Sequence, residues 1–212
     1  IVPVSTELKS LGVIIDSHLR FDRHATAKTQ ACNYHIRALR HIRRMMSAET
    51  AATIGCSLVL SRLDYCNALL HRAPSATIHK LQRVQNTLAR VITQSSGRAS
   101  AEPLLQSLHW LPIKQRIQFK LAALVFKIHS TSTPSYLNNL LHQYIPSREL
   151  RSCDGLRFVV PRAHTELGKR AFAVAAPSIW NSLPADIRAR DSLQTFRRHL
   201  KTYLFSQSYG LP

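Results

Sequence analysis

Acidic residues are scarce in this sequence of 212 residues, and those present do not form the pairs that two-metal catalysis requires. Only 11 Asp and Glu stand against 29 Lys and Arg, and no two aspartates are adjacent. Enzymes that transfer phosphoryl groups with two metal ions hold those ions on closely placed carboxylates. Glycine-rich phosphate loops, GxSxG turns and HExxH helices are also absent. We therefore assign no catalytic residue to this chain.

Cysteine is similarly rare. The four cysteines are Cys32, Cys56, Cys66 and Cys153. Their wide spacing is not that of a disulfide framework, and it favours a reducing compartment. Cys66, His71 and His79 come nearest to a metal-binding group, but their spacing matches no standard zinc pattern. We expect neither a metal site nor a bound cofactor in this chain.

Long apolar runs are missing as well. The longest, residues 121–126, is far shorter than the roughly 20 residues that a membrane-spanning helix needs. The first ten residues lack the charged start and apolar run of a signal peptide, and they contain no Met. We expect an intracellular protein with no membrane partner, whose reading frame begins upstream of Ile1.

Positive charge is the strongest feature that is present. The net charge is +18 and the pI is near 10.8. Such an excess increases the electrostatic self-repulsion of the folded chain unless a polyanion offsets it, so RNA and DNA are the expected partners. An anionic membrane surface is the weaker alternative, because the basic residues lie on helices that have ordinary apolar faces and no Trp- or Phe-rich wedge.

Apolar residues recur at helical spacing over most of the chain, which predicts a mainly α protein. We expect helices at residues 25–46, 49–73, 77–93, 103–108 and 112–128, and a last helix over residues 193–204. Ser47 and Ser192 are the expected N-caps of the second and the last of these helices. Gly55 is the expected point of close approach to a neighbouring helix.

Three of the predicted helices carry a line of basic residues beside the apolar one. These stripes are Arg37, Arg40 and Arg44; Lys80, Arg83 and Arg90; and Arg116, Lys120 and Lys127. No acid occurs between Asp22 and Glu49, whereas a purely solvated face usually mixes charges of both signs. Basic residues along a helix can follow a phosphate backbone and release its counterions. We expect the three stripes to bind nucleic-acid backbone; the alternative is that they are solvated faces.

Several polar and aromatic residues each have two interpretations. Gln82, Gln85 and Asn86 could reach sugar or base edges, or they could face water as most polar helix residues do. Trp110 could stack on a nucleobase, but a Trp before Leu-Pro more often anchors a corner in the core, and we favour the core. For Asp64 we favour a structural ion pair or hydrogen bond over a catalytic carboxylate.

Clusters of β-branched and aromatic residues predict two short β-hairpins in the otherwise helical fold. The first lies within residues 1–21, with Gly12 at a tight backbone position, and the second pairs residues 156–160 with residues 170–175. The SSGRAS loop at residues 95–100 is the expected joint between domains. We divide the chain into residues 1–24, 25–96 and 101–212.

Four stretches together resemble one known protein family. They are LGVIID at residues 11–16, SRLDYCN at 61–67, LHWLPIKQRIQFK at 108–120 and AFAVAAPSIWNSLP at 171–184. These stretches resemble the region C-terminal to the polymerase active site in the reverse transcriptases of LINE-type (non-LTR) retrotransposons, in the jockey-like branch. The resemblance extends over essentially the whole chain, and the corners at Trp110 and Trp180 are its most specific parts.

The resemblance implies a helical, thumb-like bundle in which residues 1–24 end the palm, residues 25–96 form the thumb and residues 101–212 form a C-terminal domain. The complete enzyme would grip RNA template and DNA primer, in the nucleus and the cytoplasm. Its catalytic aspartates, their Mg ions and an endonuclease domain would lie upstream in the same polyprotein. Two alternatives stay open, namely a stand-alone basic nucleic-acid-binding protein derived from a retrotransposon and a functionless relic.

Overall fold

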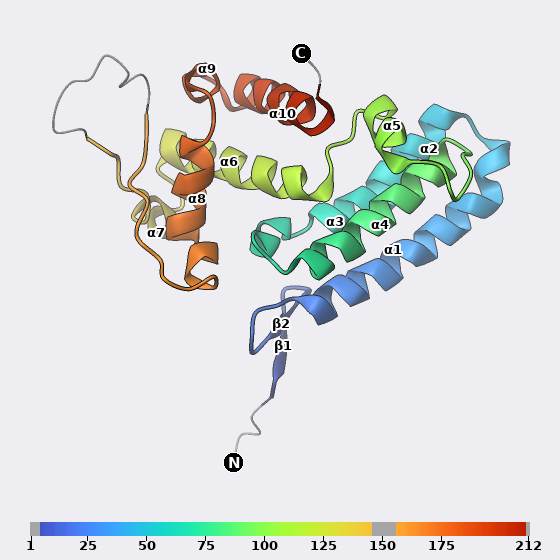
Figure 1. The fold of residues 1–212 in the computed structure, drawn as a ribbon, viewed down its shortest axis with the longest axis horizontal. Helices are drawn as coiled ribbons and strands as arrows, with labels where there is room; N and C mark the ends of the chain where they lie inside the picture. The colour runs from blue at the N-terminus through green and yellow to red at the C-terminus, as the bar shows by residue number, and fades with distance from the viewer. Residues whose placement is uncertain (1–4, 146–155, 211–212) are drawn as a thin grey trace. The chain divides into compact units, whose positions relative to one another are not determined.

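The computed structural model describes residues 5–145 and 156–210, and over these residues the chain is mainly helical (Figure 1). The helices are α1 (Asp22–Ile42), α2 (Ala48–Gly55), α3 (Ser61–Asp64), α4 (Ser75–Ile92), α5 (Ala101–Ser107), α6 (Ile113–Thr131), α7 (Ser135–Asn138), α8 (Phe172–Asn181), α9 (Ala185–Arg188) and α10 (Leu193–Tyr209), and the strands are β1 (Glu7–Ser10) and β2 (Val13–Asp16). The predicted mainly α fold with an N-terminal hairpin is confirmed.

The chain divides into two compact units, Ile1–Arg116 and Ile117–Pro212. The division falls inside α6, whereas we expected it at the loop of residues 95–100. The reason is that residues 101–116 pack against the helix on the N-terminal side of this loop. Helix α5 contacts α4 directly, and side chains of α4 hold the Trp110 corner by hydrogen bonds to Leu111 and Ile113.

The N-terminal hairpin forms where it was predicted. β1 and β2 are antiparallel, with Glu7 opposite Asp16 and Ser10 opposite Val13. Leu11 and Gly12 connect them with positive φ angles of 45° and 77°, the combination that a two-residue type I′ turn requires. Gly12 has no Cβ to oppose this backbone conformation, which explains its place in the turn.

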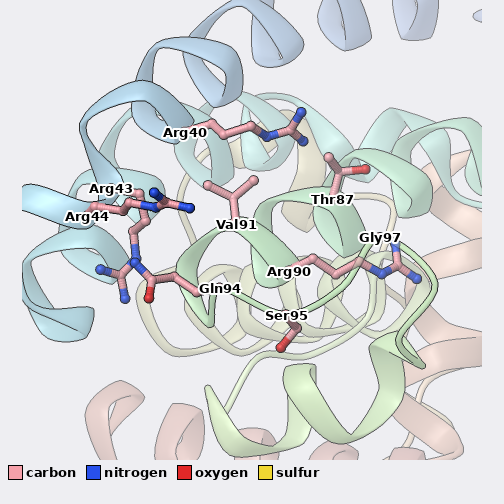
Figure 2. Close-up of a pocket in the computed structure, with 9 residues that line it drawn as sticks. All are labelled: Arg40, Arg43, Arg44, Thr87, Arg90, Val91, Gln94, Ser95 and Gly97. Atoms are coloured by element: carbon pink, nitrogen blue, oxygen red, sulfur yellow. The ribbon is translucent and has the colours of Figure 1, made fainter.

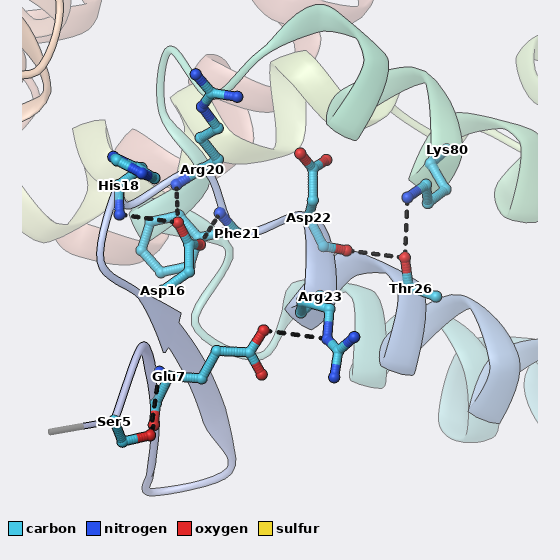
Figure 3. A network of polar contacts seen from close by, with 10 residues as sticks. All are labelled: Ser5, Glu7, Asp16, His18, Arg20, Phe21, Asp22, Arg23, Thr26 and Lys80. Carbon is cyan, nitrogen blue, oxygen red and sulfur yellow. Dashed lines mark hydrogen bonds and ion pairs between the residues drawn. The ribbon is translucent and has the colours of Figure 1, made fainter. Parts of the chain in front are cut away.

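The turn between β2 and α1 depends on Asp16. Its carboxylate accepts the backbone N–H groups of His18 at 3.2 Å, Arg20 at 3.0 Å and Phe21 at 2.6 Å (Figure 3). Partial burial acts to raise the pKa of Asp16, but these N–H groups outweigh burial and hold the pKa below its usual range. Asp16 is therefore a turn-forming residue that ends the hairpin and starts α1.

The hairpin is also held against the helices. His24, buried in the first turns of α1, accepts the Ile14 N–H through Nδ1 at 3.3 Å. Burial, together with repulsion from Lys28, lowers the pKa of His24, so the neutral acceptor form is favoured. The Tyr65 hydroxyl donates to the Leu11 carbonyl at 2.6 Å. These two hydrogen bonds fix the hairpin at its turn and at its second strand.

The second predicted helix begins as expected and ends early. Ser47 caps α2 by accepting the Thr50 N–H at 3.1 Å. A π-helical turn (Cys56–Leu60) leads into α3, which stops at Asp64 instead of continuing to residue 73. Tyr65 is extended and Cys66 has a φ of 56°, because the side chains of this segment bond to other parts of the unit. Helical periodicity could not detect those partners.

Helix α4 is the centre of the first unit, since α1, α2 and α5 all contact it. A Cβ at Gly55 of α2 would lie 2.9 Å from Ile92 Cδ1 and 3.1 Å from Leu88 Cδ1 on α4. Glycine is therefore the residue that allows this close helix approach, as predicted.

The second unit has an aromatic core. Phe126, Phe158, Trp180 and Phe196 are all buried, and Phe126 and Phe196 stack with ring centroids 4.5 Å apart. Trp180 N–H donates to the Leu156 carbonyl at 2.9 Å. Trp180 thus anchors its corner from inside the core.

The prediction of a second hairpin between residues 156–160 and 170–175 is wrong. Phe158 makes a single isolated bridge to Gln143, and most of the other segment forms α8. The apolar run at residues 171–176 is too short for its periodicity to separate a strand from a buried helix, and its alanines favour the helix. The last helix, α10, begins as predicted at Ser192, whose hydroxyl accepts the Thr195 N–H at 3.1 Å.

Candidate nucleic-acid interface

The SRLDYCN segment joins three parts of the first unit. Arg116 at the start of α6 donates through Nε to Asp64 Oδ1 at 2.8 Å and makes a second contact through Nη2 to Asp64 Oδ2. Asn67 also donates to Asp64, at 3.3 Å. Tyr65 holds the hairpin, and Lys28 of α1 lies 4.6 Å from the centre of the Tyr65 ring. The structural role expected for Asp64, in an ion pair or a hydrogen bond, is confirmed.

This ion pair changes the interpretation of Arg116. Its side chain is only 18% exposed and its guanidinium is engaged by both oxygens of one carboxylate. A bidentate pair of this kind occupies two of the five N–H donors of the guanidinium. Arg116 therefore has a structural role, and its binding to a nucleic-acid backbone stays a prediction. The other two members of its stripe, Lys120 and Lys127, lie exposed on the part of α6 in the second unit.

The Trp110 corner is held by amide side chains of α4. Trp110 is 7% exposed, so its predicted place in the core is confirmed. Gln85 is fully buried and donates to the Leu111 carbonyl at 2.9 Å. Gln82 accepts the Ile113 N–H at 2.8 Å and donates to Asn86 at 2.8 Å. These amides bind the corner and the start of α6, so Gln85 does not reach a sugar or base edge.

Lys80 has a similar local role. Its ammonium donates to Thr26 Oγ1 at 2.9 Å, and Thr26 donates in turn to the Asp22 carbonyl at 2.8 Å (Figure 3). Thr77 Oγ1 donates to the Asp22 carboxylate at 2.5 Å. Lys80 is half-buried in this network, which ties α4 to the first turn of α1. Asp22 takes part in this contact between the helices, because its carbonyl accepts from Thr26 and its carboxylate accepts from Thr77.

The remaining basic residues of the first unit gather elsewhere. Members of the first two stripes line an open pocket of about 600 Å³ at the C-terminal ends of α1 and α4 (Figure 2). The lining residues are Arg40, Arg43, Arg44, Thr87, Arg90, Val91, Gln94, Ser95 and Gly97. We call this the arginine pocket. Its lining contains four guanidinium groups and no acidic residue, and it brings residues about 50 positions apart in the sequence to one place.

Two arginines of the pocket are fixed by carbonyl groups. Arg43 is 8% exposed and donates to the Ile92 carbonyl at 2.7 Å and to the Met46 carbonyl at 2.8 Å. Arg90 donates through Nε to the Ala99 carbonyl at 2.9 Å. Because a guanidinium has five N–H donors, each of these arginines keeps further donors beyond those contacts.

The other two arginines are exposed and unengaged. Arg40 and Arg44 have no hydrogen-bond or ion-pair partner among residues 5–145 and 156–210. A cation near a helix C-terminus is stabilised by the helix dipole, and this effect accounts for Arg43, which closes the end of α4. The same effect favours Arg40 in the last turn of α1 and Arg90 in the last turn of α4. It does not remove the mutual repulsion of four guanidinium groups around one pocket, which an anion between them would offset.

Burial of an arginine does not by itself indicate a binding site in this fold, as a residue of the second unit shows. Arg188 of the second unit is 6% exposed and donates to the carbonyls of Leu183 and Leu156. Burial, helped by the nearby charge of Arg157, lowers its pKa. A buried arginine satisfied by carbonyl groups is thus a structural device in this fold. The distinguishing property of the arginine pocket is the gathering of several arginines around a solvent-accessible space.

Arg37 and Arg83 extend the positive surface beyond the pocket. Both are exposed, and neither has an ion-pair partner in the described parts of the chain. Arg43, in contrast, was not among the predicted binding residues, because it lies outside the line of Arg37, Arg40 and Arg44. The signal that could have found it is its position four residues after Leu39, which continues the buried line of Cys32, Ile36 and Leu39 into the 3₁₀ turn that follows α1.

Other kinds of chemistry have little support in the described residues. Over residues 5–145 and 156–210, no three His, Cys, Asp or Glu side chains are placed to hold a metal ion. Burial raises the pKa of the Cys32 thiol to about 11, which keeps this thiol protonated. Among the described helices, none has the length and apolar character needed to cross a membrane.

Comparison of the chain with protein-family models, with curated proteins and with solved structures gives no match.

Proposed function

We propose that the first unit binds the phosphate backbone of RNA and DNA through the arginine pocket and the adjoining face of α1 and α4. The observation that carries this proposal is the convergence of four arginines, without an acid, on one open pocket of about 600 Å³. Such a site attracts any phosphate chain and reads no base edge, so binding is independent of sequence.

We further propose that the chain is the non-catalytic C-terminal part of a LINE-type reverse transcriptase. The resemblance of its SRLDYCN and LHWLPIKQRIQFK segments to that family supports this proposal. In the complete enzyme the unit grips RNA template and DNA primer, and an upstream palm supplies the catalytic aspartates and Mg. The second candidate is a stand-alone nucleic-acid-binding protein, which the net charge of +18 supports equally.

The pocket is tested by removing its two unengaged arginines. The variant is Arg40→Gln/Arg44→Gln, and the matched control is Arg197→Gln/Arg198→Gln, which removes the same charge from exposed positions of α10. Fluorescence anisotropy measures binding of unrelated RNA and DNA oligonucleotides between about 50 and 200 mM salt. We expect the pocket variant to bind every sequence on the order of tenfold more weakly, with a slope of log K against log salt reduced by about 2.

An unchanged salt slope in the Arg40/Arg44 variant would mean that the pocket is only a solvated surface. An equal loss in the α10 control would mean that general charge, and not the pocket, drives binding. The origin of the chain is tested separately by sequencing the transcript upstream of Ile1. An in-frame pair of aspartates on a strand–turn–strand pattern supports the polymerase; a stop codon or a nearby start codon supports the stand-alone protein.

A further inference from the structure

Tyr34 is a large aromatic residue left uncovered in the middle of α1. It is 71% exposed, and its ring meets the ring of its neighbour His35 edge-on, with centroids 5.4 Å apart. The Tyr34 hydroxyl has no partner among the described residues. Tyr65 of the same unit differs, because its hydroxyl and ring are both engaged by the hairpin and Lys28. Nothing in the fold of the first unit requires an aromatic residue at position 34.

The residues around Tyr34 leave its ring accessible. Ala31 and Ala38, about one helical turn before and after it, lie on the same line of α1 and are exposed. Their small side chains cannot cover the ring. Arg37 lies on the adjacent line, and the next turns in that direction carry Arg40 and Arg44, which are also exposed.

The distance along the helix suits an extended polyanion. Tyr34 and Arg44 lie about ten positions apart, which corresponds to about 15 Å of helix axis. Over this length α1 has no acidic residue. The face therefore combines a free aromatic ring with a row of positive charges that ends in the arginine pocket.

We propose that Tyr34 stacks on an unpaired nucleobase of a single strand whose phosphates lie on Arg37 and in the arginine pocket. The inference rests on the proposed function and adds that the site binds a single strand more tightly than a duplex of the same sequence. Proteins that bind single strands combine a basic track with aromatic rings on which bases stack. In a duplex the base faces are hidden by their neighbours, so the ring contributes only when a base is unpaired. The excess of arginine and the absence of acid favour a nucleic-acid strand over a protein segment on this face.

The test compares Tyr34→Ala and Tyr34→Phe with the parent chain. The ligands are a short single-stranded oligonucleotide that carries 2-aminopurine and a duplex with the same sequence. We expect Tyr34→Ala to bind the single strand about tenfold more weakly, the fold-change that corresponds to loss of one base stack, with the affinity for the duplex unchanged. Tyr34→Phe retains the ring and binds as the parent does. Tyr136→Ala, which removes a 69% exposed tyrosine from α7, is the matched control.

Two outcomes would overturn the inference. One is equal binding of the single strand by Tyr34→Ala and the parent, which would assign the exposed face to another partner. The other is an equal loss for single strand and duplex. Either result leaves the arginine pocket intact if Arg40→Gln/Arg44→Gln still lowers the salt slope. If that variant also binds as the parent does, the proposed function fails as well, so the two failures are distinguishable.

Discussion

Replacing Gln85 by Met tests whether the Trp110 corner depends on α4 for its polar contacts. Gln85 has no exposed surface, donates to the Leu111 carbonyl at 2.9 Å and accepts from Gln82 at 3.0 Å. Met has nearly the shape of Gln, so the substitution preserves packing and removes both hydrogen bonds. A buried polar group that loses its partner costs about 1–3 kcal/mol, and the better burial of the thioether offsets part of this cost. We expect the free energy of unfolding to fall by about 1–2 kcal/mol.

Urea and thermal denaturation measure this change, and the Tm is expected to fall by about 3–8 °C. Gln30→Met is the matched control, because Gln30 is exposed on α1 and makes no side-chain hydrogen bond within the described residues. Its effect on the free energy of unfolding is expected to stay within about 0.5 kcal/mol. If Gln85→Met unfolds at the same urea concentration as the parent, the corner does not depend on this amide. If it keeps its stability but loses affinity for nucleic acid, Gln85 is a ligand-binding residue and its structural assignment is wrong.

Two further predictions concern the hairpin and the helix packing. Burial holds the pKa of His24 in the folded state below its usual 6.5. The unfolded chain therefore binds a proton at His24 more tightly than the folded chain does. The free energy of unfolding is expected to fall as pH decreases from about 7 through 6.5 towards the lower pKa of the folded state. His24→Asn keeps an acceptor for the Ile14 N–H without titrating, and urea titrations at several pH values are expected to show a shallower dependence; an unchanged dependence would contradict the assignment. Gly55→Ala places a Cβ 2.9 Å from Ile92 Cδ1. Overpacking costs about 1–3 kcal/mol, and the higher helix propensity of Ala offsets about 1 kcal/mol of this cost. The free energy of unfolding is therefore expected to fall by about 1 kcal/mol. Gly97→Ala, whose Cβ has no atom within 4 Å, is the control, and equal urea midpoints for the two variants would refute the close approach of α2 to α4.

The sequence predicted correctly those features that depend on local interactions. Ser47 and Ser192 cap helices because their hydroxyls bond to N–H groups only three residues away. The first hairpin follows from two short β-branched runs joined by Leu11 and Gly12. The long amphipathic helices α1, α4 and α6 follow from apolar spacing that repeats over several turns. In each case the decisive atoms lie within a few residues of one another.

The error at α3 occurred because the decisive partner is distant in sequence, whereas the second hairpin was wrong because a short apolar run does not distinguish a strand from a buried helix. The helix that includes α3 ends at Asp64 because Asp64 pairs with Arg116, 52 residues later, and because Tyr65 bonds to Leu11, 54 residues earlier. The same pairing gives Arg116 a structural role that its place in a basic stripe did not predict. A helical wheel shows which residues share a face, but it does not show which of them another helix covers.

The sequence alone determined the excess of arginine and lysine, its arrangement on helices and the lack of acids between Asp22 and Glu49. These properties favour a phosphate-rich partner. The tertiary structure decided which of the basic residues remain available. Packing of α1 against α4 engages Lys80 locally, and it brings Arg40 and Arg44 to the same pocket as Arg90. Charge is fixed by composition, whereas solvent access and mutual distance exist only once the helices have packed.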